Sequence, residues 1–150
     1  MTLWPGADEA GDDRSMCERL ELGGLTGFGD ADGPVQATDE TCAATYSDGM
    51  AVLTVAVRRF DDEAAAASAY AAVPALDGGT GAAGVVSGWD ETRHEQGAGT
   101  GGWVTQEVLR RGTTVVEVRL ELSGAIPPSA MQAAAEAVAR VAAKVRALVE

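Results

Sequence analysis

The clearest alternation of apolar and polar residues lies near the C-terminal end of the chain. Within residues 113–122, large apolar residues occupy every second position from 116 onward and alternate with charged ones, which is typical of a β-strand with one covered face. These apolar residues are Val116, Val118, Leu120 and Leu122. The stretch 103–109 precedes them across Arg110-Arg111-Gly112, so the pattern predicts a β-hairpin.

A second hairpin is predicted earlier in the chain. Residues 38–46 and 50–60 flank Ser47-Asp48-Gly49, and Asp-Gly favours the positive φ angles that tight hairpin turns need. The second arm is richer in large apolar residues on one face, as in an antiparallel sheet that is covered on one side.

Two segments have helical patterns. Asp61-Asp62-Glu63 precedes an alanine-rich run that ends at Val73 before Pro74, and acidic residues favour the start of a helix. Pro127-Pro128-Ser129 opens a longer segment to about residue 149, whose apolar residues recur at helical spacing. We expect this long helix to cover the sheet.

The rest of the chain has weaker patterns. Residues 1–14 are interpreted as a flexible tail, residues 15–22 as a short strand or one or two helical turns, and residues 23–34 as irregular. Nine glycines between residues 77 and 103 indicate loops, with a short strand over 85–93. We expect the stretch 97–102 to carry the chain to the next edge of the sheet. The sequence therefore predicts one α+β domain over residues 15–150, with a mostly antiparallel sheet of about five strands, a short middle helix and a long C-terminal helix.

Charge narrows the classes of partner. The net charge is −12, with −9 in the first fifty residues. Nucleic acid is a poor partner because its binding depends on Lys and Arg. The acidic first third is interpreted as a solvated face, with a docking surface for a basic partner or a cation as the alternative.

No apolar run approaches the roughly 20 residues that span a membrane. The first residues resemble no export signal, so such a signal would have to precede them.

The two cysteines, Cys17 and Cys42, leave two interpretations open. They lack the spacing of a zinc site or a redox motif. Two buried thiols of a cytosolic protein are one alternative, and a disulfide of an exported domain is the favoured one, because both cysteines lie where regular pattern is weakest.

Few residues suggest chemistry. His94 is the only histidine, and a general base oriented by Glu95 or Asp90 is weighed against a histidine of an exposed loop or strand edge. The glycines of 97–102 lack the following helix and lysine of a phosphate loop, and the acids of 30–40 lack calcium-loop spacing. We therefore predict no catalytic residue, metal site or cofactor.

Trp89 and Trp103 are expected in the core, with an apolar ligand pocket or an interface as the alternative.

Several features together resemble the secreted actinobacterial lipoprotein domains of unknown function that are related to the extracellular sensor domain of a mycobacterial serine/threonine kinase. The residues that carry the resemblance are Cys17 with 20–22, Cys42 ahead of 50–60, the acid-led helix from Asp61, Gly101-Gly102-Trp103 before a strand, and the helix over 129–149. The resemblance implies a sheet packed by helices, a disulfide between Cys17 and Cys42, and a cell-surface location on a lipid anchor. The lipobox of that family does not occur in this sequence, and no catalytic residues follow from the family.

The leading functional hypothesis is a non-enzymatic, extracytoplasmic binding or sensor-like domain of the cell envelope. It would recognise a small ligand or an envelope protein in a groove between sheet and helix, with Trp89, Trp103 and His94 as candidate contacts. The alternatives are a hydrolase that uses His94 with a neighbouring carboxylate, and a cytoplasmic protein-interaction domain.

Overall fold

The computed structural model describes residues 16–25, 27–33, 35–38, 41–73, 80–84, 89–98, 102–124 and 126–149. The predicted tail at 1–14 lies outside these residues. The helices are α1 (Met16–Arg19), α2 (Glu63–Ala72) and α3 (Pro128–Val149). The strands are β1 (Gly24–Leu25), β2 (Gly29–Asp30), β3 (Gln36–Thr38), β4 (Thr41–Tyr46), β5 (Ala51–Arg59), β6 (Thr80–Gly84), β7 (Glu91–Ala98), β8 (Gly102–Arg111) and β9 (Thr114–Ser123).

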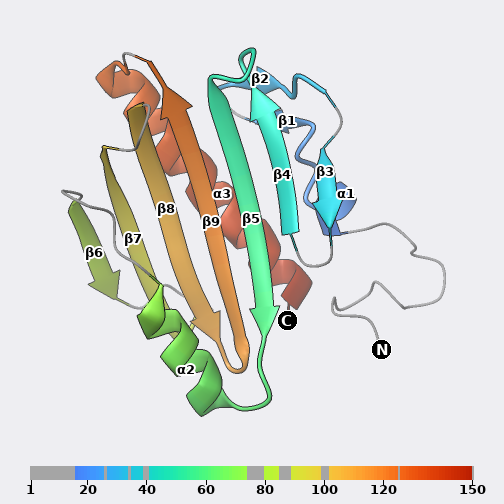
Figure 1. The fold of residues 1–150 in the computed structure, drawn as a ribbon, viewed down its shortest axis with the longest axis vertical. Coiled ribbons are helices and arrows are strands. Elements are labelled where there is room, and N and C mark those ends of the chain that lie inside the picture. Colours follow the sequence, from blue (N-terminus) through green and yellow to red (C-terminus); the bar gives the residue numbers. More distant parts are fainter. Residues whose placement is uncertain are drawn as a thin grey trace.

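The main sheet is antiparallel throughout and has the strand order β3-β4-β5-β9-β8-β7-β6, while β1 and β2 form a separate pair (Figure 1). The predicted α+β class, both hairpins and both longer helices are confirmed. The sheet has seven strands, more than the expected five or so.

The two additional strands are β3 and β6, and β6 lies in the glycine-rich stretch where a loop was predicted. β7 overlaps the short strand predicted over 85–93 but extends further, to Ala98, while residues 85–88 lie outside the described residues. β6 and β7 pair from Thr80↔Gln96 to Gly84↔Thr92, and Gly97 lies within β7. The stretch 97–102 does not carry the chain to another edge, because β7 and β8 are direct neighbours with Ala98 opposite Trp103. Glycine and alanine give no apolar alternation, so hydrogen bonding between neighbouring strands sets this structure.

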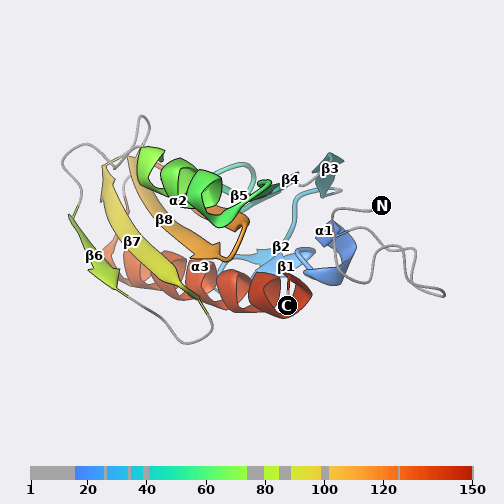
Figure 2. The same ribbon diagram turned by 90° about the horizontal axis from the view of Figure 1, so that it is seen from below.

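The helices lie on opposite faces of the sheet, with α3 running diagonally behind β8, β9 and β5 and α2 crossing the other face at one end (Figures 1 and 2). The main core lies on the α3 face, where inward side chains of β5 and β9 meet one stripe of α3. Its fully buried members include Leu53, Val55, Val118, Leu120, Ala134, Val138 and Val145. A smaller cluster beneath α2 joins Ala66 and Tyr70 to Val108 and Val115.

The N-terminal segment is fixed to the α3 face by covalent, apolar and polar contacts. Cys17 and Cys42 form a disulfide between α1 and β4, as favoured from the sequence. Leu20 and Leu22 are buried in the main core. The buried Tyr46 hydroxyl donates to the Leu22 carbonyl at 2.5 Å. This segment therefore covers the β4 side of the sheet, which α3 leaves free.

Candidate functional site

An apolar pocket of about 290 Å³ lies where the ends of β5 and β9, the β1–β2 turn and the first turn of α3 come together. Its lining residues come from four separate segments of the chain: Gly27, Phe28, Ser47, Met50, Ala51, Leu122, Ser123, Ile126, Pro127 and Ala130. It therefore lies between the sheet and a helix, at the end of the sheet opposite α2.

The β4–β5 turn forms one wall. Ser47 and Asp48 both have φ of 56° and Gly49 has φ of 83°, so three consecutive residues adopt the left-handed conformation of a tight turn. The amides of Asp48 and Gly49 therefore point away from the hydrogen bonds that pair β4 with β5. The Asp32 carboxylate accepts from the Asp48 amide at 3.0 Å and from the Gly49 amide at 2.7 Å. These two bonds fix the turn, and with it the position of Met50.

The β1–β2 turn forms the opposite wall and presents Phe28. The Phe28 amide donates to the Leu25 carbonyl at 2.9 Å, which closes the turn. The chain then continues alongside β4, where the Ala31 backbone bridges to Tyr46 and the Asp32 amide donates to the Thr45 carbonyl at 2.8 Å. Hydrogen bonds to core strands therefore hold this wall in place.

The floor is made where β9 passes into α3. The Ser123 amide donates to the Met50 carbonyl at 2.8 Å, so β5 and β9 stay paired up to the pocket. Gly124 has φ of 85°, and the Met50 Cε lies 3.5 Å from where a Cβ on Gly124 would stand. A side chain at Gly124 would be strained by the positive φ, while its Cβ would be in ordinary van der Waals contact with Met50.

The pocket has the chemistry of a binding site for an apolar group. No lining side chain is charged, and the polar ones are the hydroxyls of Ser47 and Ser123. Phe28 and Ile126 are half-buried. Met50 is 51% exposed and is the only large apolar residue classed as exposed among the described residues. An exposed apolar side chain beside a concave apolar surface is typical of a contact with a ligand or partner.

His94 lies elsewhere, in β7 between β6 and β8. Its Nδ1 is 3.2 Å from Glu107 Oε1 on the neighbouring strand. Neither predicted orienting carboxylate is the one that pairs with it. Glu95 points to the opposite face of the sheet because successive strand residues alternate, and the Asp90 carboxylate accepts from the Gly112 amide.

The two tryptophans do not line the pocket. Trp89 is 5% exposed within the main core, and Trp103 packs half-buried against that core. Trp103 lies opposite Leu122, a lining residue, so it supports the pocket from one strand away. The Trp103 Nε1 is buried without a hydrogen-bond acceptor.

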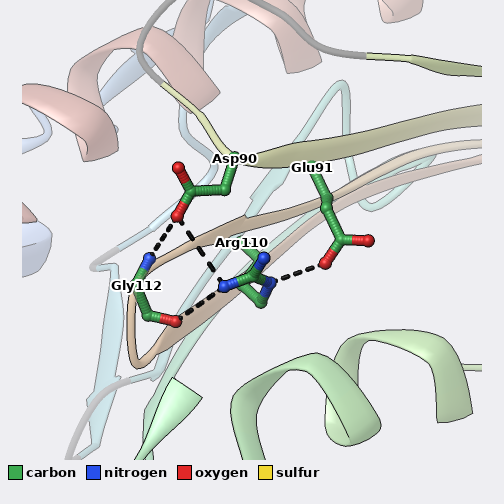
Figure 3. A network of polar contacts seen from close by, with 4 residues as sticks. All are labelled: Asp90, Glu91, Arg110 and Gly112. Atoms are coloured by element: carbon green, nitrogen blue, oxygen red, sulfur yellow. Dashed lines mark hydrogen bonds and ion pairs between the residues drawn. The ribbon is translucent and has the colours of Figure 1, made fainter. Parts of the chain in front are cut away.

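A polar network closes the β8–β9 hairpin at the other end of the sheet (Figure 3). Arg110 donates to Glu91 at 2.6 Å and to the Gly112 carbonyl at 3.0 Å, while Asp90 accepts from the Gly112 amide at 2.7 Å. The hydrogen bond that Arg110 donates to the Glu91 carboxylate raises the pKa of Arg110. Because its groups satisfy one another and the backbone, we interpret this network as structural.

A second network anchors the C-terminal end of α2 to the sheet. Glu95 accepts from Gln106 at 2.7 Å and lies 3.2 Å from Arg93 without alignment for a hydrogen bond. Arg93 donates to the Val73 carbonyl at 2.8 Å and lies over the Tyr70 ring. Burial, together with the nearby carboxylates, raises the pKa of Tyr70. This side-chain cluster also joins a helix to strands.

Sequence reasoning missed the pocket, although some local signals were present. Met50 is a large apolar residue directly after an Asp-Gly turn, and Ile126 precedes two prolines that force the chain out of the sheet. Neither signal states that the two residues meet. Asp32 was interpreted as part of a solvated acidic loop, with a calcium ligand as the alternative, whereas its carboxylate accepts from two turn amides.

No family model matches the chain, and a search of the curated proteins found no match. Within the part of the chain that the structure describes, no three His, Cys, Asp or Glu side chains are placed to hold a metal ion. No helix among those residues is long and apolar enough to cross a membrane.

Proposed function

We propose that this chain is a non-enzymatic, extracytoplasmic binding module that takes up an apolar group in the pocket between the sheet end and α3. The observation that carries the proposal is the pocket itself, about 290 Å³ and lined by apolar and small residues, with Met50 exposed at its side. Its walls are held by backbone and carboxylate hydrogen bonds, so no large rearrangement is needed to open it.

The proposed location rests on the disulfide. A disulfide between two buried cysteines is typical of proteins from oxidising compartments outside the cytoplasm, and neither cysteine remains as a free thiol. This supports export, and with it the resemblance to secreted sensor-like lipoprotein domains, which we keep as part of the proposal.

Titration with N-phenyl-1-naphthylamine tests the binding function. This neutral apolar dye gains fluorescence in apolar sites, and its lack of charge avoids repulsion by the acidic protein. Ala130→Phe fills the pocket from the first turn of α3, and we expect it to weaken binding at least about tenfold. Ala139→Phe, on the exposed side of the same helix, is the matched control and should leave the affinity within about twofold.

A second pair of variants removes apolar surface. Met50→Gln should weaken dye binding about fivefold, the expected effect of losing part of one apolar side chain. Met131→Gln, half-buried in α3 and not part of the lining, makes the same change outside the pocket. Equal affinities for wild type, Ala130→Phe and Met50→Gln would show that the pocket is not a binding site.

A further inference from the structure

Three exposed aspartates lie in the two chain segments that form the walls of the pocket. Asp48 is in the β4–β5 turn between the lining residues Ser47 and Met50, and Asp32 binds the amides of that turn. Asp30 follows Gly29 and Phe28 on the β1–β2 side. The lining itself contributes no lysine or arginine. We call Asp30, Asp32 and Asp48 the acidic rim.

The positive end of the α3 helix dipole does not outweigh the negative charge of the acidic rim. Pro127 and Pro128 have no amide hydrogen, and the amides of Ala130 and Met131 donate to the Pro127 carbonyl at 3.0 and 3.2 Å. Most of the donors that an anion would need at a helix start are therefore absent or used. A helix N-terminus is equivalent to about half a positive charge, which is smaller than the three full negative charges of the acidic rim.

The pocket and the acidic rim together define the chemistry of the occupant. Resting on the proposed function above, we propose that the site binds a basic segment of a partner protein. One large apolar side chain of that segment enters the pocket, and lysines or arginines beside it face Asp30, Asp32 and Asp48. The interaction combines an apolar anchor with complementary charge, and the two contribute to affinity and to selectivity respectively.

The acidic rim beside the pocket favours a basic protein segment over a free neutral molecule, and the volume of the pocket is compatible with that occupant. The pocket volume of about 290 Å³ lies at the lower limit of small-molecule pockets, which is roughly 300 Å³. Such a space holds one large side chain, while the acidic rim lies outside it and can be reached by neighbouring residues of an extended chain. A membrane surface is disfavoured because its anionic lipids would repel a protein of net charge −12.

Binding of three blocked pentapeptides tests the proposal with the oxidised full chain. The first has phenylalanine between two pairs of lysines, the second replaces every lysine by glutamate, and the third replaces phenylalanine by glycine. Amide chemical shifts of the ¹⁵N-labelled protein should respond to the first peptide at Ser47, Met50, Ser123 and Ala130. The other two should bind at least about tenfold more weakly, and raising salt from about 20 to about 300 mM should weaken the first.

Charge variants separate the acidic rim from the overall charge. Asp30→Asn with Asp48→Asn should weaken the lysine peptide about three- to tenfold at low salt, while Asp32 is kept because it fixes the turn. Asparagine tolerates the positive φ of residue 48. The control, Asp61→Asn with Glu63→Gln, removes two exposed acids at the α2 end and should change affinity less than about twofold.

The outcomes distinguish this inference from the proposed function. If the neutral dye binds in the pocket but the glutamate peptide binds as tightly as the lysine peptide, the basic partner is excluded and the binding function stands. Equal weakening by both charge variants, or shifts confined to residues outside the pocket, would also overturn the inference. If neither the dye nor the lysine peptide binds, both proposals fail.

Discussion

Removing the hydroxyl of Tyr46 is expected to destabilise the protein in a way that depends on pH. Tyr46 is 0% exposed, and its hydroxyl donates to the carbonyl of Leu22 across 24 residues of chain. Tyr46→Phe leaves that buried carbonyl without its donor, which costs about 1–3 kcal/mol of unfolding free energy at neutral pH. The change also loosens the N-terminal segment beside β4.

The pH dependence follows from the same burial. Burial of the phenol away from water raises the pKa of Tyr46 from 10.0 to about 12. Between these values the unfolded chain has lost the phenolic proton while the folded protein keeps it, so stability is fully present below pH 10 and falls as pH rises to 12. At about pH 11.5 the wild type should have lost about 2 kcal/mol through this group, and Tyr46→Phe loses none of it.

Urea unfolding of both proteins at pH 7 and at about pH 11.5, followed by far-UV circular dichroism, measures the effect. Groups common to both proteins cancel in the difference, including Tyr70, whose pKa is also raised. The variant should be less stable at pH 7 and close to the wild type at the alkaline pH. A difference that is the same at both pH values would refute the assignment of Tyr46 as a buried neutral phenol.

Three further predictions concern stability. Reduction of the Cys17–Cys42 disulfide, which closes a loop of sequence separation 25, should lower the unfolding free energy by about 3 kcal/mol in urea. Gly102→Ala should cost about 1–3 kcal/mol by thermal unfolding, because the added Cβ would overlap the Leu122 carbonyl oxygen. Asp62→Ala should cost about 1 kcal/mol in the same assay, because the Asp62 carboxylate caps α2 by accepting from the Ala65 amide at 2.7 Å.

Matched controls make these predictions decisive. Free thiols detected after unfolding without reductant would contradict the disulfide. Gly23→Ala adds a Cβ with no atom within 4 Å, so it should be tolerated. An equal cost at Gly23 and Gly102 would disprove the steric explanation. Asp61→Ala should cost less than Asp62→Ala, because the carboxylate that bonds the helix amide belongs to Asp62.

Most of the secondary structure could be predicted from the sequence. The alternating residues of β5 and β9, the Asp-Gly turn, and the acid-led start of α2 and proline-led start of α3 depend on neighbours only a few positions apart. Such signals involve residues close together in the chain, so they can be recognised in the sequence without knowledge of the fold. The Cys17–Cys42 pairing was also accessible, because the chain has just these two cysteines.

Side-chain contacts between neighbouring strands could not be predicted from the sequence in the same way. For His94, Glu95 and Asp90 were the only carboxylate partners considered, yet it pairs with Glu107, 13 positions away, since strand register decides which side chains share a face. Likewise, β6 and part of β7 are built from glycine and alanine, whose small side chains give no periodic signal. Their strand structure depends on hydrogen bonds to neighbours.

Local patterns of residues were enough to predict the α+β class, the two hairpins and the two longer helices, and the acid in the first fifty residues can be read directly. The meeting of Phe28, Met50, Leu122 and Ile126 around one pocket is a property of the folded chain. These residues lie as much as 98 positions apart, from Phe28 to Ile126, and form no motif. The pocket exists because the ends of the strands and the first turn of α3 place apolar side chains opposite one another. Local sequence patterns do not indicate contacts between residues so far apart in the chain.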